Sequence, residues 1–262
     1  MATVREIYDR IDTLWPFATQ MGFDNAGFLV GRGDREVKKI LLSLDITPAV
    51  AKEAAEIGAE LIVSHHPVIF FPAKTVNDAE PVGQTLLELI ENCIAAICVH
   101  TNLDKAPGGV SDALAEALGL ENIGYLEVVE QLESGNYGIG RYGELKDEME
   151  LETFCAMAKK ALGSNGLRYA GCGKKVKKVA VGGGACHEFV KNALDCGCDT
   201  FLTSDLKYND FLDAPDLGIN IIDAGHYPTE NVVMPVIEKA LGEDFPEIKL
   251  FMSRHSEVIN YV

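Results

Sequence analysis

The chain has 262 residues, 47% of them apolar and 24% charged, so it has globular composition and is long enough for one large domain or two ordinary ones. Its 40 acidic and 23 basic residues give a formal net charge of -17, which argues against a surface that binds nucleic acid or anionic membrane throughout. No apolar run reaches the roughly 18 residues of a membrane span. Seven cysteines without a CxxC pair are typical of reduced thiols, so we expect a cytoplasmic protein.

The first 120 residues alternate between helical and strand patterns. Apolar residues at helical spacing predict a helix at 4–15, which ends at Pro16. Continuously apolar runs predict strands buried on both faces, and two further helices lie between them. The strands are 38–46, 60–66 and 93–101, and the helices are 48–58 and 83–92. This order indicates a mostly parallel sheet covered on both faces.

The pattern of polar and apolar residues changes from about residue 122, where a polar–apolar strand at 136–145 precedes a helix at 152–163. Strand–helix alternation then resumes, with strands at 177–184, 199–205, 219–225 and 248–254 and helices at 186–197, 208–214 and 229–242. Residues 153–185 contain 7 basic residues and no acidic one, which indicates a separate unit. We therefore expect two tightly packed α/β lobes with mostly parallel or mixed sheets flanked by helices, at 1–121 and 122–262.

Three groups of polar residues follow predicted strands, which is where open α/β sheets place their ligands. The groups are residues 64–67, 100–104 and 223–230, and they contain four of the six histidines of the chain. Scattered structural histidines would not be expected to gather in this way. The segment 221–232 of the second lobe is therefore predicted to return to a site in the crevice between the lobes.

The residue types in these groups favour two metal ions. Consecutive imidazoles at His65 and His66 are expected to diverge as they leave a strand, so two adjacent ions suit them better than one. His226 and Glu230 are four residues apart and share a face once a helix begins there. Glu230 can then bridge two ions, and Asp104 supplies a further oxygen. Three histidines and two carboxylates suit two divalent ions of Zn, Fe, Mn, Co or Ni, without choosing among these metals.

Hydrolysis is the natural reaction class for such a pair. Two adjacent divalent ions lower the pKa of a shared water and polarise a carbonyl, ring carbon or phosphoryl oxygen. Ring opening of GTP and cleavage of a phosphodiester both fit, and a non-catalytic metal-binding regulatory or scaffold ring is the alternative of another class. A metal-bound water and the bridging Glu230 are the only groups assigned to the reaction, and no other side chain is predicted to be catalytic.

Five segments together resemble one known family. FDNAGFLVG, SHHPVIF, HTNLDKAPGGV, SDLKYND and DAGHYPTE occur in this order from about residue 21 to 231. They are similar to the motif series of the GTP cyclohydrolase I type 2 homolog family, also called the NGG-one-interacting-factor-three-like family. The resemblance implies that His65 and Asp104 hold one ion, that His66 and His226 hold the other, and that Glu230 touches both.

The resemblance also implies a GTP cyclohydrolase-like hydrolase with a nucleotide substrate, and a two-lobed subunit that assembles into a toroidal homohexamer. Two features depart from the family pattern. Phe23 stands where the family usually has Trp before Asp-Asn, which leaves open the role of Asp24 and Asn25. The C-terminal segment SRHSEVINYV matches no pattern of the family.

Further residues have two interpretations each. Four lysines at 174–178 and the glycine turn 182–184 could bind a phosphate through free backbone N–H groups, but a tight turn with a solvated basic edge is the more ordinary interpretation. His100 is expected to orient a loop or a ligand rather than to bind metal. His255 is either a proton donor or a surface residue. Asp205 and Lys207 are further candidates for lining the same cleft.

Overall fold

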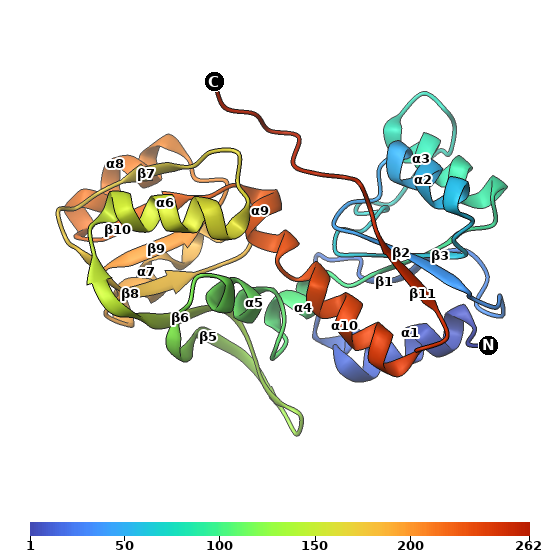
Figure 1. The fold of residues 1–262 in the computed structure, drawn as a ribbon, viewed down its shortest axis with the longest axis horizontal. Coiled ribbons are helices and arrows are strands. Elements are labelled where there is room, and N and C mark those ends of the chain that lie inside the picture. The colour runs from blue at the N-terminus through green and yellow to red at the C-terminus, as the bar shows by residue number, and fades with distance from the viewer. The chain divides into compact units, whose positions relative to one another are not determined.

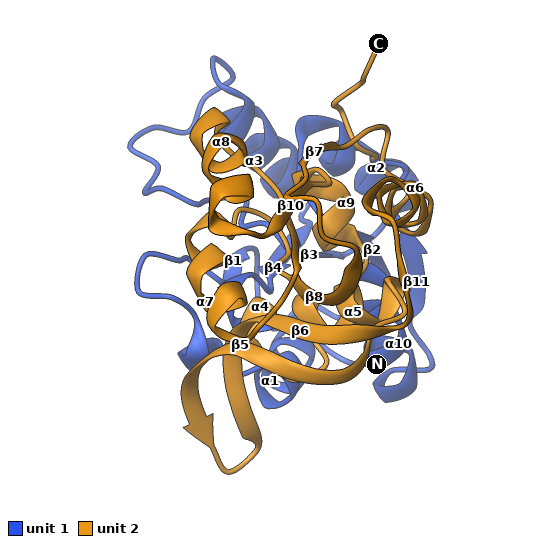
Figure 2. Ribbon diagram, turned by 90° about the vertical axis from the view of Figure 1, so that its left-hand side faces the viewer, with its two compact units in different colours: residues 1–103, 234–255 blue, residues 104–233, 256–262 orange.

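The computed structural model describes residues 1–262 and divides into two compact units. Unit 1 comprises residues 1–103 and 234–255, and unit 2 comprises residues 104–233 and 256–262, as coloured in Figure 2. The chain therefore passes between the units three times. The boundary expected at 121/122 falls within unit 2. None of the helices has the length and apolarity needed to cross a membrane.

Unit 1 is built on a five-stranded sheet with the order β1-β4-β3-β2-β11. Its strands are β1 (Gly27–Val30), β2 (Lys39–Ser43), β3 (Leu61–Ser64), β4 (Ala95–Cys98) and β11 (Lys249–Met252). All neighbours in the sheet are parallel except β1 and β4, which are antiparallel. The helices are α1 (Val4–Leu14), η1 (Phe17–Thr19), α2 (Pro48–Ile57), α3 (Pro81–Glu91) and α10 (Met234–Asp244). Figure 1 labels the four α-helices.

Unit 2 is built on a six-stranded mixed sheet with the order β5-β6-β8-β9-β10-β7. Its strands are β5 (Glu121–Leu132), β6 (Gly135–Met149), β7 (Arg168–Ala170), β8 (Val176–Val181), β9 (Thr200–Thr203) and β10 (Asn220–Asp223). Its helices are α5 (Val110–Ala117), α6 (Leu151–Leu162), η2 (His187–Phe189), α7 (Val190–Asp195), α8 (Tyr208–Leu217) and α9 (His226–Asn231). The short helix α4 (Thr101–Lys105) contains the point where unit 1 ends and unit 2 begins.

Local sequence signals explain where several helices begin and end. The Thr47 hydroxyl accepts a hydrogen bond from the Val50 N–H at 3.2 Å, and Pro48 occupies the first turn of α2. Gly58 then ends α2 in the left-handed region, with a φ of 67° that suits glycine. These signals confirm the helix predicted at 48–58. The expected class, an α/β protein with two sheets flanked by helices, is also confirmed.

Three of the expected elements differ in extent or place, because tertiary contacts decide them. The residues predicted as one helix at 229–242 form α9 and α10, which belong to different units. The last strand, β11, pairs in parallel with β2, so the chain returns to the first sheet (Figure 1). A short apolar strand carries no signal for which edge it will join. The strand predicted at 136–145 is also longer, because β6 pairs with β5 on one side and β8 on the other.

The apolar core of each unit lies against its own sheet. In unit 1, Leu41, Ile62 and Ala96 of three adjacent strands pack with Val50 of α2 and Leu86 of α3. In unit 2, separate apolar clusters contain α6 with strand residues and α7 with strand residues. Because buried packing of this kind fixes the backbone, the ends of the strands become rigid supports for polar side chains.

Candidate metal centre

Three histidines of unit 1 gather where two neighbouring parallel strands end. β3 ends at Ser64, directly before His65 and His66, and β4 ends at Cys98, two residues before His100. Ser64 is in register with Cys98, so the two strand ends are level. The three imidazoles offer ligand atoms that all lie within 4.8 Å of one another. Their ring centroids are 5.1 to 5.5 Å apart.

The expected divergence of His65 and His66 is therefore wrong. It assumed that both residues continue the strand, where successive side chains point to opposite faces. The strand stops at Ser64, and the His66 N–H donates to the Leu44 carbonyl oxygen at 2.8 Å instead of extending the ladder to β4. The turn brings the two rings to the same side. His100 also lies among the donors, although it was expected only to orient its neighbours.

Each of these rings has its Nδ1 held by a different partner. His65 Nδ1 lies 2.8 Å from the Val99 carbonyl oxygen, which can only accept, so the ring carries its proton on Nδ1. His66 Nδ1 lies 2.8 Å from Asp45, and His100 Nδ1 lies 2.7 Å from Asp24. Nε2 is then the nitrogen through which each ring can bind an ion. Oxygen partners behind an imidazole are typical of metal-binding histidines, because they fix its tautomer and orientation.

The two carboxylates behind these rings remain ionised. Burial raises the pKa of Asp24, but hydrogen bonds from His100 and from Thr101 outweigh it and leave this pKa at about 2. Burial likewise raises the pKa of Asp45, and its interactions with His66 and His255 outweigh that effect and lower it. Asp45 was not predicted as a site residue, and the only local signal for it was a carboxylate near the end of the strand predicted at 38–46. The role of Asp24, open from the sequence alone, is to hold His100 and Thr101 by hydrogen bonds.

Unit 2 brings together an imidazole and three carboxylates. α9 begins at His226, one turn before Glu230, and His226 Nε2 lies 3.0 Å from a Glu230 oxygen. Asp205 holds the opposite nitrogen, Nδ1, at 2.5 Å. Asp104, in α4, offers a carboxylate oxygen within 4.8 Å of one of Glu230. The predicted sharing of a helix face by His226 and Glu230 is confirmed, and Asp205 is one of the cleft residues expected from the sequence.

His226 is protonated at neutral pH in this arrangement. Burial lowers its pKa, but the hydrogen bonds to Asp205 and Glu230 outweigh burial and raise it to about 11. The same contact with His226 lowers the pKa of Asp205. A proton therefore occupies the place between the ring and Glu230 that a cation would take. His226 and Glu230 therefore suit a divalent ion, because an oriented imidazole and a carboxylate are typical metal ligands.

Gly184 makes room for this donor set. Its φ of +63° favours glycine, and a Cβ at this position would lie 2.1 Å from Glu230 Oε1 and 3.3 Å from His226 Cε1. Its N–H donates to the Thr229 hydroxyl at 3.1 Å, and the Gly182 N–H donates to the Leu202 carbonyl oxygen at 3.0 Å. These two N–H groups are therefore not free to hold a phosphate. The helical residues that follow start only at His187.

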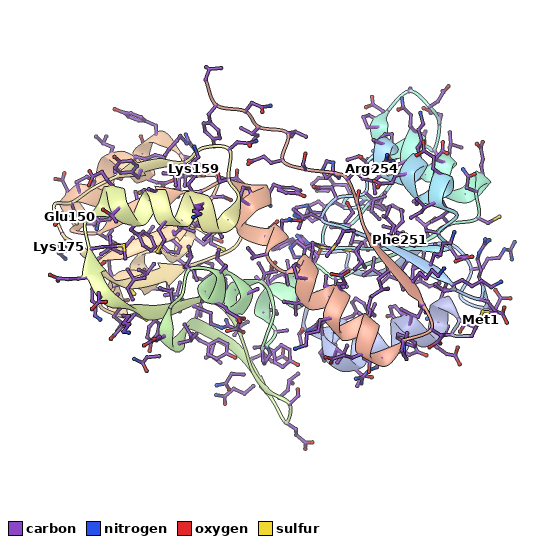
Figure 3. The ribbon with its side chains drawn as sticks, in the orientation of Figure 1. Met1, Glu150, Lys159, Lys175, Phe251 and Arg254 are labelled. Carbon is purple, nitrogen blue, oxygen red and sulfur yellow. The ribbon has the colours of Figure 1, made fainter.

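The four lysines at 174–178 also have partners within unit 2. Lys174 donates to the Gly218 carbonyl oxygen at 2.7 Å, and Lys177 donates to that of Leu145 at 2.6 Å. Lys175 lies 3.4 Å from Glu148 and 3.5 Å from Glu150, at the edge labelled in Figure 3. Lys178 lies over the Tyr142 ring. These contacts favour the ordinary interpretation, a tight turn beside a basic strand edge.

The C-terminal segment that matched no family pattern has defined contacts in each unit. In unit 1, Arg254 Nε donates to Glu53 at 3.0 Å, and His255 Nε2 lies 3.3 Å from Asp45. In unit 2, the Asn165 side chain donates to the Ile259 carbonyl oxygen at 2.7 Å. His255 and His66 thus share Asp45, which places His255 behind the histidine cluster rather than on an unrelated surface.

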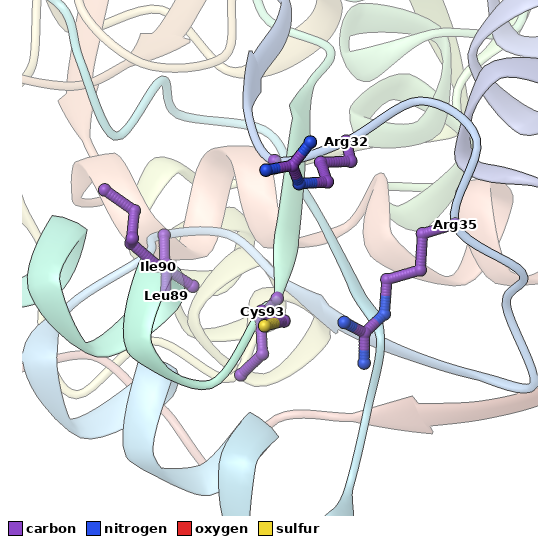
Figure 4. Close-up of a pocket in the computed structure, with 7 residues that line it drawn as sticks. Arg32, Arg35, Leu89, Ile90 and Cys93 are labelled. Atoms are coloured by element: carbon purple, nitrogen blue, oxygen red, sulfur yellow. The ribbon is translucent and has the colours of Figure 1, made fainter.

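A pocket of unit 1 contains none of the predicted site residues. It has a volume of about 500 Å³ and is lined by Gly31, Arg32, Arg35, Leu89, Ile90, Cys93 and Ile94 (Figure 4). The candidate centre is therefore defined by the histidine and carboxylate donors and not by this pocket.

The fold and these donor sets define a class, namely α/β proteins with two sheets and strand-end histidines and carboxylates suited to divalent metal ions. The chain belongs to the Duf34/NIF3 (NGG1p interacting factor 3) family, whose sequence profile matches residues 2–258. It is 36% identical over 256 residues to the GTP cyclohydrolase 1 type 2 homolog of Clostridium perfringens, covering 97% of each chain.

Two solved structures are similar over nearly their whole length. A Bacillus cereus protein related to NIF3 has a TM-score of 0.92 and 26% identity, covering 100% of this chain and 99% of that one. A Staphylococcus aureus hypothetical protein has a TM-score of 0.90 and 29% identity, covering 99% of each chain. The family expected from the sequence motifs is therefore confirmed.

Proposed function

We propose that this chain is a metal-dependent hydrolase that binds two divalent ions and acts on a nucleotide. In this proposal His65, His66, Asp104, His226 and Glu230 bind the ions, and Glu230 bridges them. Zn, Fe, Mn, Co and Ni all suit these ligands. The observation that carries the proposal is that His66 and His226 each have Nδ1 held by a carboxylate, from Asp45 and Asp205 respectively, as in oriented metal ligands.

The proposed carboxylate ligands lie close to the points where the chain passes from one unit to the other. Unit 1 ends at Leu103 and unit 2 begins at Asp104, so this proposed ligand is the first residue after a crossing. A second crossing, between Val233 and Met234, follows Glu230 by only three residues.

The chemistry follows from what each residue can do. Two adjacent divalent ions, when bound, lower the pKa of a water and polarise the substrate atom that it attacks. Asp45 and Asp205 hold the His66 and His226 rings in place. Glu230 accepts from His226 Nε2 at 3.0 Å, and this proton would leave when an ion takes its place. A nucleotide substrate, with GTP as the named candidate, is supported by family membership and by the name that relatives such as the Clostridium perfringens protein carry.

The metal centre is tested by elemental analysis of protein purified without chelators. We expect about two equivalents of metal per chain in the wild type, as in other two-metal sites. Glu230→Gln keeps the shape of the side chain but removes the bridging charge, so most of the metal should be lost. Glu243→Gln, at an exposed position of α10, is the matched control and should retain it. Absence of metal from the wild type would overturn the proposal.

The reaction is tested by incubating metal-loaded protein with GTP and measuring formate, which ring opening releases. Formate release by the wild type, and its loss in Glu230→Gln, would support the cyclohydrolase reaction. Cleavage of a generic phosphodiester with the guanine ring intact would identify a phosphodiesterase instead. Full metal content without turnover of either compound would identify the metal-binding regulatory ring as the correct alternative.

The proposed assembly is a homohexamer in the cytoplasm. Family membership supports the assembly, and the seven cysteines, none in a disulfide, are consistent with a reducing compartment. Light scattering coupled to gel filtration tests the assembly. A mass of six chains is expected, and a monomer at micromolar concentration would contradict it.

A further inference from the structure

Three phenylalanines of unit 1 form an exposed aromatic cluster. Phe23, Phe70 and Phe71 are 65%, 36% and 78% exposed. The ring centroids of Phe23 and Phe70 are 6.4 Å apart, and those of Phe70 and Phe71 are 4.8 Å apart, in edge-to-face arrangements. Single exposed apolar residues are common, but a contiguous group of large aromatic rings on a surface usually marks a site of binding.

The cluster is held in place by hydrogen bonds between the two loops that carry it. Asn25 follows Phe23 closely, and its side-chain NH₂ donates to the Ile69 carbonyl oxygen at 2.5 Å, just before Phe70. Asp24 accepts hydrogen bonds from the Thr101 N–H at 3.0 Å and from His100 Nδ1 at 2.7 Å. The residues between and beside the aromatic rings therefore fix the loops to each other and to the start of α4.

The cluster adjoins the histidines that can bind metal. The centroid of the Phe70 ring is 6.1 Å from that of His100, with an angle of 83° between the ring planes. His100 in turn belongs to the group of three imidazoles with ligand atoms within 4.8 Å of one another. A molecule that reacts at these histidines and extends outward over Phe70 would meet the exposed rings of Phe23 and Phe71.

We infer that Phe23, Phe70 and Phe71 are the surface on which the planar heteroaromatic ring of the substrate stacks. This inference rests on the proposed function and deepens it by assigning the residues that recognise the base. Aromatic side chains stack on bases because both have flat π faces, and this stacking strengthens binding without selecting a base by hydrogen bonds. Exposed rings that are already held in place lose little further freedom on binding.

The test compares the binding of two probes to metal-loaded protein. GTP carries the ring, and inorganic tripolyphosphate carries only the phosphate chain. We expect Phe71→Leu and Phe23→Leu to weaken GTP binding about tenfold each, because leucine keeps an apolar side chain but has no π face. Tripolyphosphate binding and metal content should stay unchanged. Tyr208→Leu removes an aromatic ring that is 75% exposed in unit 2 and should change none of these values.

Several outcomes would overturn the inference. One is GTP affinity equal to that of the wild type in both phenylalanine variants. Others are an equal loss of tripolyphosphate affinity, or no GTP binding by the metal-loaded wild type. A change in the oligomeric mass of the variants with unchanged GTP affinity would show that the cluster instead contacts a second copy of the chain. Because metal content is measured separately, loss of the metal centre in the wild type would be recognised as failure of the proposed function.

Discussion

Four histidines have Nδ1 held by an oxygen atom, although the residue that supplies the oxygen differs: His65, His66, His100 and His226. A backbone carbonyl oxygen holds Nδ1 of His65, and carboxylates hold Nδ1 of the other three. Each ring can therefore bind an ion through Nε2 without first changing its tautomer. At the scale of single residues, the partners behind the imidazoles thus matter as much as the imidazoles themselves.

Gly184 offers a sharp test at this scale. Gly184→Ala should reduce metal content and any hydrolytic turnover at least tenfold, because the added Cβ would lie 2.1 Å from Glu230 Oε1 and displace that carboxylate. Gly163→Ala is the matched control, since Gly163 has a φ of +64° with nothing within 4 Å of the added Cβ. Both variants should lose about 1 kcal/mol of stability from backbone strain. Equal metal content in the two variants would contradict this role of Gly184.

The protonation of His226 predicts that metal binding is coupled to proton release. Its pKa of about 11 means that the imidazole is protonated at pH 7.5 in metal-free protein. A metal ion needs the unprotonated nitrogen, so binding should release about one proton from this residue, and metal affinity should rise with pH. Isothermal titration in two buffers with different ionisation enthalpies measures the proton release. Identical binding enthalpies in the two buffers would show that no proton leaves.

At the scale of elements, the proposed site depends on where strands and helices end. His65 and His100 follow β3 and β4, and His226 is the first residue of α9 after β10. Because β3 and β4 are parallel neighbours, their carboxyl ends lie at the same edge of the unit 1 sheet, which is why the motifs of His65 and His100 converge. The pairing of β3 with β4 therefore brings histidines that are distant in the sequence into one cluster.

The contact between α2 and the residues after β11 predicts a pH dependence of stability. Burial raises the pKa of Glu53, but hydrogen bonds from Ser253 and Arg254 outweigh it and lower it below the ordinary 4.5. A lowered folded-state pKa stabilises the protein above about pH 4.5, and this contribution is lost as the pH falls through the lowered value. Glu53→Gln should therefore lower the free energy of unfolding at pH 7 by about 1–3 kcal/mol.

Urea unfolding of the wild type and Glu53→Gln at pH 7 and at pH 3.5 measures this effect. The difference between the two proteins should shrink at the lower pH. Glu36→Gln, at an exposed position that makes no ion pair, should match the wild type at both values. A difference that grows on acidification would contradict the assignment of the effect to the Glu53 carboxylate.

At the scale of the whole molecule, the net charge of -17 says little about the site. Asp104 and Glu230 are the acidic residues proposed as metal ligands, and Asp24, Asp45 and Asp205 orient histidines. The four lysines at 174–178 contact carbonyl oxygens, carboxylates and an aromatic ring, so they are not grouped as a free anion site. Charge composition alone could not have distinguished carboxylates that are proposed to bind metal from those that orient histidines.

Removal of metal should destabilise the whole protein. An ion that binds only the folded state adds about 2.7 kcal/mol at a free concentration of one hundred times its Kd. We therefore expect a chelator to lower the melting temperature of the wild type measured by calorimetry. Re-addition of metal should restore it. Glu230→Gln should show a much smaller change, and an equal change in both proteins would place the stabilising ion elsewhere.

The sequence could predict much of the candidate centre because its chemistry lies in short contiguous motifs. The predicted pairing of His226 with Glu230 needs only helical periodicity, and the predicted ends of β3 and β4 need only apolar runs followed by polar residues. Asp45 and Gly184 could not be found in this way. Their roles depend on contacts with residues 21 and 46 positions away, and no local pattern encodes such contacts.

The α/β class, the positions of most elements, the family and the residue types offered to a metal could all be predicted from the amino-acid sequence. The return of the last strand to β2, the sharing of Asp45 by His66 and His255, and the contact of Phe70 with His100 emerged only from the folded chain. Periodicity and caps act over a few residues. Strand pairing and side-chain contacts are instead selected by the packing of segments that are distant in the chain.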